Sequence, residues 1–246
     1  MSHPNRGDFA RNTRLLRITV MAAVIGGLST VAAYVLLDLI RFFTNLIFFQ
    51  TLSVADRSPA THTLGAWVIV VPVLGGLIVG LMARYGSDKI RGHGIPEAIE
   101  AILFGKSKMS PKVALLKPLS SGIVIGSGGP FGAEGPIIMT GGAIGSLLAQ
   151  HFHLTAAERK ALLVAGATAG MTAVFGTPVA AVLLAVELLL FELRPRSLLP
   201  VAVACAVAGF ARPLLMEPGP LFPLQTPGAE ATAGSTPPSD SPGFAQ

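Results

Sequence analysis

One carboxylate stands alone in a long apolar stretch of this chain. Glu134 lies in the pentapeptide Gly-Ala-Glu-Gly-Pro at residues 132–136, and the 16 residues on each side of it carry no charge. A lone acid is costly in hydrocarbon, so its presence indicates an ion or proton pathway. The flanking glycines and proline are typical of a helix start, where free N–H groups and partial positive charge suit an anion.

Two further motifs have the same Gly/Pro punctuation. They are Gly-His-Gly-Ile-Pro-Glu at residues 92–97 and Phe-Gly-Thr-Pro at residues 175–178. Broken helices are tolerated in a membrane where they are buried in protein or line a water-filled cavity. None of the three motifs contains Lys or Arg, so we expect converging helix N-termini to hold an anion by N–H dipoles, without a full positive charge.

Three side chains in and near these motifs are candidates for chemistry. The Glu134 carboxylate can act as a tethered anion that occupies the anion position and swings away when protonated; the alternative is a cap for the helix start. His93 can donate an N–H to an anion, or it is a turn residue. Glu187 lies in an apolar helix, where it relays protons, or is a satisfied core carboxylate or a helix-end acid.

Composition places these motifs in a membrane. Of 246 residues, 51% are hydrophobic and 13% charged, and the mean hydropathy is +0.65, which predicts a polytopic membrane protein. The uncharged runs at residues 18–37, 63–83 and 161–186 are long enough to span a bilayer. Shorter runs such as residues 197–211 are too short to cross upright and predict tilted, broken or partly inserted helices.

The distribution of charge predicts the orientation. The net charge of +5 is the usual Lys/Arg excess of membrane-protein loops and does not indicate nucleic-acid binding. Arginines before the first apolar run and the basic segment 84–112 predict that both lie in the cytoplasm. A signal peptide is the competing interpretation of the N-terminus, but the first run is longer than a typical h-region. The single cysteine, Cys205, excludes an intrachain disulfide.

Periodic breaks in the apolar pattern predict the elements and domains. Helices are expected at residues 18–49, 63–83 with a kink at Pro72, from about Ile95, and at 113–128, 135–150, 161–174, 179–190 and 198–211, with a polar connection at 151–160. Glycine pairs with helix-packing spacing are Gly76/Gly80, Gly122/Gly126, Gly141/Gly145 and Gly166/Gly170. We expect a basic tail at 1–14, a transmembrane domain at 15–221 and a disordered Pro/Ser/Ala-rich tail at 222–246.

The sequence lacks enzyme motifs. Residues 126–128, Gly-Ser-Gly, resemble the start of a dinucleotide loop, but Phe131 stands where the third glycine is needed. There is also no phosphate loop and no His-Glu-x-x-His sequence. We therefore expect a protein that is not an enzyme and that has no cofactor and no metal.

Taken together, the three motifs resemble the CLC family of chloride channels and chloride/proton exchangers. Residues 92–97 resemble the family's GSGIPE motif, residues 132–136 its GxEGP motif, and residues 173–180 the segment that opens the following helix. The resemblance runs from about Leu15 to Leu221. It implies an all-α membrane protein, a CLC-type bundle of tilted and broken transmembrane helices that forms the first half of an inverted repeat.

The resemblance also implies roles for single residues. Glu134 would be the external gating glutamate, and His93 stands where the family usually has a serine facing the central anion. Glu187 matches the first of a paired acid position, but Leu188 replaces the second, the internal proton acceptor of exchangers, which favours passive conduction. The implied anion-binding residues are His93, Gly94, Ile95, Pro96, Ala133, Gly135, Pro136 and Ile137.

The implied function is transmembrane transport of chloride, or a similar anion, by a channel or exchanger. Such a protein is an integral multi-pass protein of a lipid bilayer, here a bacterial inner or plasma membrane, with a cytoplasmic N-terminus. Because the chain resembles only the first of the two halves of the family's inverted repeat, we expect a homodimer or a complementing second CLC half as partner. The alternative is a truncated, non-conducting membrane subunit or remnant.

Overall fold

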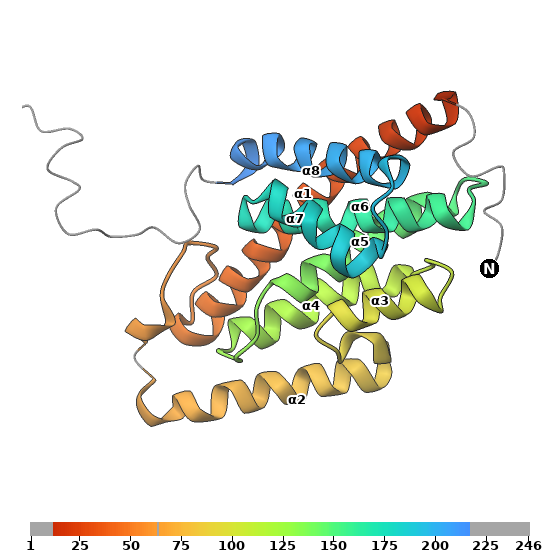
Figure 1. Ribbon diagram of the computed structural model, residues 1–246. Coiled ribbons are helices and arrows are strands. Elements are labelled where there is room, and N and C mark those ends of the chain that lie inside the picture. Colours follow the sequence, from red (N-terminus) through yellow and green to blue (C-terminus); the bar gives the residue numbers. More distant parts are fainter. Residues whose placement is uncertain (1–11, 63, 217–246) are drawn as a thin grey trace, which may run out of the picture.

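The computed structural model describes residues 12–62 and 64–216, and within these ranges it contains helices and no strand (Figure 1). The α-helices are α1 (Asn12–Phe49), α2 (Val70–Tyr85), α3 (Ile95–Leu103), α4 (Pro111–Gly126), α5 (Glu134–Gln150), α6 (Ala156–Phe175), α7 (Pro178–Leu184) and α8 (Pro195–Leu215). Three short 3₁₀ turns lie at Pro59–Thr61, Gly65–Ile69 and Asp88–Ile90, and a π-helical turn, η4 (Ala185–Leu190), continues α7.

The first helix is a single continuous element of 38 residues. At 1.5 Å per residue it is about 57 Å long, which exceeds the roughly 30 Å of a hydrocarbon core and requires a steep tilt or a projecting end. Asp38 and Arg41 do not break it, because they form an ion pair of 3.5 Å one turn apart. The helix begins at Asn12, earlier than expected, so it includes the end of the predicted basic tail. The rest of that tail and the predicted tail at 222–246 lie outside the described residues.

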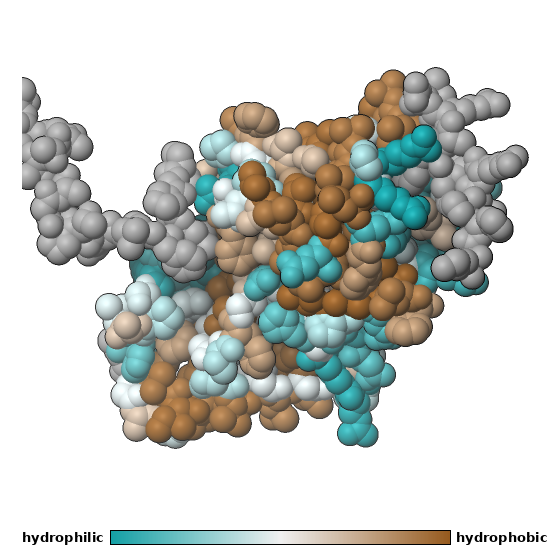
Figure 2. Space-filling model, viewed as in Figure 1, coloured by the Kyte–Doolittle hydropathy of each residue, from teal (hydrophilic) through white to brown (hydrophobic). Residues whose placement is uncertain are grey.

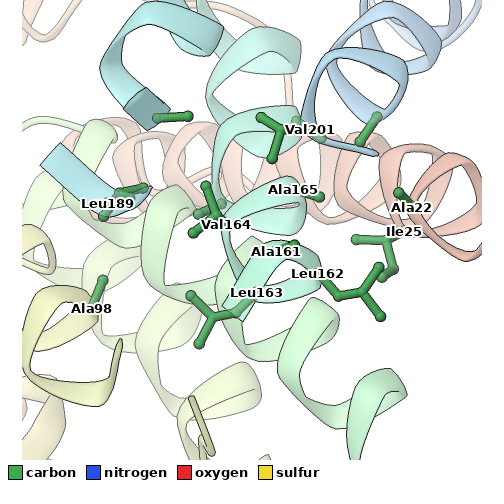
Figure 3. Close-up of a cluster of buried hydrophobic side chains, with 14 of the residues drawn as sticks. Ala22, Ile25, Ala98, Ala161, Leu162, Leu163, Val164, Ala165, Leu189 and Val201 are labelled. Atoms are coloured by element: carbon green, nitrogen blue, oxygen red, sulfur yellow. The ribbon is translucent and has the colours of Figure 1, made fainter. Parts of the chain in front are cut away.

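The core is built around α6, which packs against α1, α5 and α8. Figure 3 shows Leu162, Leu163 and Val164 of α6 within a cluster that also contains side chains of α1 and α8. Small residues let the backbones approach closely: a Cβ at Gly141 would overlap the carbonyl of Gly166, and the reverse is also true. Close approach through small residues is a main way in which helices associate in lipid.

Three of the four predicted glycine pairs pack in this way. Gly122 and Gly126 of α4 face α1, where a Cβ would lie 2.8 Å from Cγ of Leu39 and 2.6 Å from Cβ of Phe43 respectively. The prediction was wrong for Gly76 and Gly80, because no atom lies within 4 Å of the position of a Cβ on either residue. Both belong to α2, the helix along the lower edge of Figure 1.

That helix, α2, is the most peripheral part of the bundle. Trp67 in the turn before it and Val73, Leu77 and Tyr85 within it are all exposed, and Figure 2 shows apolar side chains along this edge. Pro72, where a kink was expected, lies in the first turn of α2, where its missing N–H has no intrahelical partner to lose.

Two helix boundaries differ from the expected ones. Instead of a polar connection at 151–160, α6 begins at Ala156, where Thr155 and Glu158 form a capping box. The run at 197–211 extends into the 21-residue α8, so it is not too short to span a bilayer. By length and hydropathy, three described helices can cross a membrane: Arg14–Phe49, Gly65–Tyr85 and Pro195–Leu215.

Candidate functional site

The loop before α3 forms a tight helix start. Gly94 has φ +117°, a conformation that side chains rarely adopt, and it is buried. Its N–H donates to Oε2 of Glu97 at 2.7 Å, so the carboxylate at the third position of the helix caps the chain that enters it. Ile95 and Pro96 are the first two residues of α3. The expected helix start near Ile95 is confirmed.

The start of α5 lies directly against this loop. A Cβ at Gly135 would overlap the carbonyl oxygen of His93, and a Cβ at Gly94 would overlap the carbonyl group of Gly135. The two motifs therefore meet through main-chain atoms, and only glycine permits the contact at either position. Pro136 follows in the first turn, and Ile137 donates its N–H to Ala133 at 3.0 Å to close that turn.

The third motif also adjoins α5. It separates α6 from α7: Gly176 ends α6 with φ +70°, and Pro178 begins α7. Phe175 and Ala133 pack against one hydrophobic cluster, which includes Ile137 of α5 and Val174 of α6. The third motif thus shares a hydrophobic cluster with the start of α5.

Glu134 is the first residue of α5 and is half-buried. In the part of the chain that the structure describes, its carboxylate has no hydrogen bond or ion pair, and the N-cap, Ala133, makes no side-chain capping bond. The capping alternative therefore has no support in the described contacts. Glu97 and Glu158 behave differently, since both accept a hydrogen bond from a backbone N–H three residues earlier.

A cavity of about 170 Å³ opens beside the two joined motifs. Gly92 and His93 line it from the loop before α3, and Gly132 and Pro136 line it from the start of α5. His93 is exposed, and its Nδ1 lies 3.2 Å from the position that a Cβ on Gly135 would take. The imidazole is therefore placed to donate or accept a hydrogen bond at the edge of this cavity.

The opposite wall of the cavity carries a residue that the sequence analysis missed. Lys117 of α4 is only 3% exposed, and its ammonium donates to the carbonyls of Ile90, at 3.1 Å, and Gly92. None of the three motifs contains Lys or Arg, but a full positive charge is thus packed against the first of them in space. Arg212 is a second such cation, since its Nε donates to the carbonyl of Ala173 at 3.1 Å beside Gly176.

Glu187 lies apart from these groups. It is exposed, within the π-helical turn η4, so it is not a buried core carboxylate. Its element packs against α6 and α3. The neighbouring Leu188 is 36% exposed, and Lys160 donates to the carbonyl of Leu190 at the end of the turn.

The contact between the loop before α3 and the start of α5, with Glu134 beside it, defines a class of protein. This class is a helical membrane protein in which a lone carboxylate lies where broken helices meet. The chain belongs to the voltage gated chloride channel family, whose model matches residues 75–243. Among the described residues, no group of three or more His, Cys, Asp or Glu side chains is arranged to hold a metal ion.

Curated relatives and a solved structure agree with this assignment. The chain is 33% identical over 144 residues to a ClcB-like chloride channel protein of Ralstonia nicotianae, covering 57% of this chain and 34% of the relative. It is 29% identical over 216 residues to the voltage-gated ClC-type chloride channel ClcB of Yersinia pseudotuberculosis, covering 86% and 51%. The chain thus spans about half or less of the length of these relatives.

The fold resembles about half of a solved structure, that of a slow cyanobacterial Cl⁻/H⁺ antiporter. The crystal structure of that protein matches with a TM-score of 0.63 and 21% sequence identity, over 87% of this chain and 48% of the antiporter chain. The expected all-α membrane fold is confirmed by this match. At this level of identity the likeness concerns the fold alone.

Proposed function

We propose that this chain forms part of an anion pathway that carries chloride across a bacterial inner or plasma membrane. The observation that carries the proposal is the main-chain contact between Gly94 and Gly135, which joins two motifs at the one lone carboxylate, Glu134. Membership of the voltage gated chloride channel family supports chloride as the anion.

Helix geometry supplies the attraction for the anion. The first N–H groups of α3 and α5 have no intrahelical acceptors and carry partial positive charge. Such dipoles replace part of a hydration shell without binding the ion too tightly to release it. We assign the anion site to His93 and to the segments Gly94–Pro96 and Ala133–Ile137. Within them the N–H groups of Ile95, Ala133 and Gly135 are the candidate donors, because Pro96 and Pro136 have no N–H and those of Gly94 and Ile137 already donate to Glu97 and Ala133.

Glu134 acts as the gate in this proposal. Its ionised carboxylate is an anion on a tether, and it competes with chloride for the same N–H groups. Protonation removes that charge and frees the position. The absence of a hydrogen-bond or ion-pair partner for this carboxylate among the described residues supports such mobility.

The pathway needs further protein. The chain matches 51% of the length of the Yersinia channel, so we assign the remaining anion ligands to a second CLC half, or to a second copy in a homodimer. Passive conduction is favoured over proton exchange because Leu188 stands where an exchanger has its internal acid. Lys and Arg in the segment before α4 favour a cytoplasmic N-terminus.

Chloride flux into liposomes tests the gate, with the chain reconstituted alone and together with a complementing second half. We expect flux with the second half, and we expect Glu134→Gln to remove most of the pH dependence of its rate. Glu100→Gln is the matched control, because Glu100 is an exposed acid of α3 paired with Lys89 at 3.6 Å. An unchanged pH profile in Glu134→Gln would exclude the gating role, and no flux in any combination would exclude the transport function.

A further inference from the structure

The starts of three helices bring basic side chains to one end of the bundle. In Figure 1, α1, α6 and α8 all begin at the right-hand end of the molecule. Residues 14–17, 158–160 and 187–196 cover these starts and the connection into α8, and they contain six basic side chains and three acidic ones. The basic residues are Arg14, Arg17, Arg159, Lys160, Arg194 and Arg196. This end therefore carries a surplus of positive charge.

Contacts between α6 and α8 place two of these residues at one level. The thiol of Cys205 interacts with Thr168, and Gly209 lies beside Thr172, so the two helices run parallel. Both helices rise by the same distance per residue. Counting back equal lengths from these contacts places Arg196 at the level of Arg159.

The first helix adds a third cation at the same level. It also runs parallel to its neighbours, because Arg14 pairs with Glu158 at the start of α6 while Ile25 packs against Gly166 further along. A Cβ on the next residue, Gly26, would lie 2.6 Å from the carbonyl oxygen of Ala204 in α8. Arg17 precedes that contact by nine residues, as the first residues of α8 do.

Most of these cations lack an acidic partner. No ion pair among the described residues includes Arg17, Arg159, Lys160 or Arg196. Arg159 and Lys160 donate to the main-chain carbonyls of Leu154 and Leu190.

The acids of this end are largely engaged. Glu158 is fully buried in its pair with Arg14. Glu192 pairs with Arg194 at 3.3 Å and accepts from the hydroxyl of Ser197. Glu187 alone remains exposed without a described ion pair. The positive charge of this end is therefore not balanced by the described carboxylates.

Exposed apolar side chains adjoin the cations. Leu16 of α1 is 65% exposed and Leu193 before α8 is 73% exposed, and Val20 and Leu199 are exposed one turn further along. Figure 2 shows hydrophilic residues around the start of α8 beside an apolar surface. Cations next to apolar surface suit the headgroup level of a bilayer. A water-soluble acidic peptide would leave these apolar side chains uncovered, whereas lipid acyl chains cover them.

We infer that the starts of α1, α6 and α8 form a binding surface for an anionic phospholipid. The phosphodiester contacts the basic side chains, Arg17 and Arg196 foremost, and the acyl chains cover the neighbouring leucines. The ligand class is a phosphatidylglycerol-type lipid, whose net negative charge a zwitterionic lipid lacks. The inference requires that the chain lies in a bilayer, but it does not depend on anion transport.

Native mass spectrometry of the full chain in detergent micelles tests this surface. The probes are dioleoylphosphatidylglycerol and dioleoylphosphatidylcholine, which share acyl chains and differ in the headgroup. We expect the wild type to bind the anionic lipid several-fold more tightly. Arg17→Gln combined with Arg196→Gln should weaken that binding about tenfold or more, since each basic residue near an anionic lipid surface contributes about fivefold. Binding of phosphatidylcholine should not change.

Lys106→Gln combined with Lys108→Gln is the matched control. It removes the same charge from the loop between α3 and α4, at the same end of the molecule, and both lysines are exposed. This variant should bind phosphatidylglycerol as the wild type does. Melting in lipid-free micelles checks that both double variants fold, which we expect because neither includes a residue of a described ion pair.

Three results would overturn the inference. Equal affinity of the wild type for the two lipids would exclude recognition of the headgroup charge, and this comparison does not depend on whether a variant folds. Unchanged binding in the folded arginine variant would exclude this surface. An equal loss in the lysine control would show that the lipid responds to the overall charge of this end, without a site at the three helix starts.

Discussion

At the scale of single residues, Gly135 determines whether the two motifs can meet. Its α-carbon faces the carbonyl oxygen of His93, and a methyl group there would overlap that oxygen. The atom that would have to move belongs to the main chain, so the clash cannot be relieved by a side-chain rotation. The contact therefore requires a glycine at position 135.

Gly135→Ala should separate the loop from α5. Overpacking in a close-packed interior costs about 1–3 kcal/mol, and we expect a loss of that size in the free energy of unfolding, measured by denaturant titration in micelles. Chloride affinity should fall with it, because the cavity wall moves.

Gly76→Ala is the matched control. This glycine also lies in a helix, but nothing is within 4 Å of the added methyl group. The change should be neutral, or stabilising by about 0.4–1 kcal/mol through the unfolded chain. Equal destabilisation by both substitutions would contradict the steric account of Gly135.

Two charged residues show what the sequence could and could not predict at this scale. Glu134 stands out because apolar residues surround it, and the structure places it at a helix start, as predicted. Lys117 bears the same signal, a charge within an apolar run, but it was not singled out as a buried charge near the motifs. Its contact with Gly92 joins residues 25 apart and depends on how α4 packs, which no local pattern specifies.

At the scale of elements, one ion pair joins the beginnings of α1 and α6. Arg14 reaches Glu158 with Nε–Oε1 at 2.6 Å and Nη2–Oε2 at 2.9 Å. Glu158 is fully buried and also accepts from the N–H of Thr155 at 2.8 Å. A single carboxylate therefore caps α6 and attaches it to α1.

Glu158→Gln should destabilise this junction by about 2 kcal/mol, because it weakens hydrogen bonds to a charged, fully buried carboxylate while the remaining charge, Arg14, is partly exposed. The midpoint of denaturant unfolding in micelles measures the loss. Glu100→Gln, which breaks the exposed pair with Lys89, should change the free energy of unfolding by less than about 1 kcal/mol. Similar shifts for both variants would show that Glu158 does not attach α6 to α1.

The boundaries of helices were predicted unevenly, for identifiable reasons. The break at residues 175–178 was predicted correctly because Gly and Pro interrupt a helix by their own backbone chemistry. The start of α6 was placed too late, although Thr155 and Glu158 form a readable capping-box pattern. The apolar runs therefore showed that helices exist, while caps and charges extended them beyond the apolar residues.

At the scale of the whole molecule, the distribution of charge predicts an orientation in the bilayer. The loop between α3 and α4 contains Lys106 and Lys108, whereas the loop between α1 and α2 is far less basic. By the positive-inside rule, we propose that the loop between α3 and α4 faces the cytoplasm and that the loop between α1 and α2 faces the opposite side.

Cysteine labelling tests this orientation. In a background with Cys205→Ala, a membrane-impermeant maleimide should label Arg57→Cys from outside intact spheroplasts. It should label Lys106→Cys only after the membrane is opened, because the bilayer shields that loop. Labelling of Lys106→Cys in intact spheroplasts would invert the proposed topology.

The joint between the loop before α3 and the start of α5 is made of peptide groups. The backbone geometry of the site is therefore independent of the side chains that determine its ion selectivity. Side chains around it, at position 93 for example, can be exchanged without disturbing the main-chain contact that joins the two helix starts. Substitutions at that position can therefore change which ion is preferred while the main-chain joint persists.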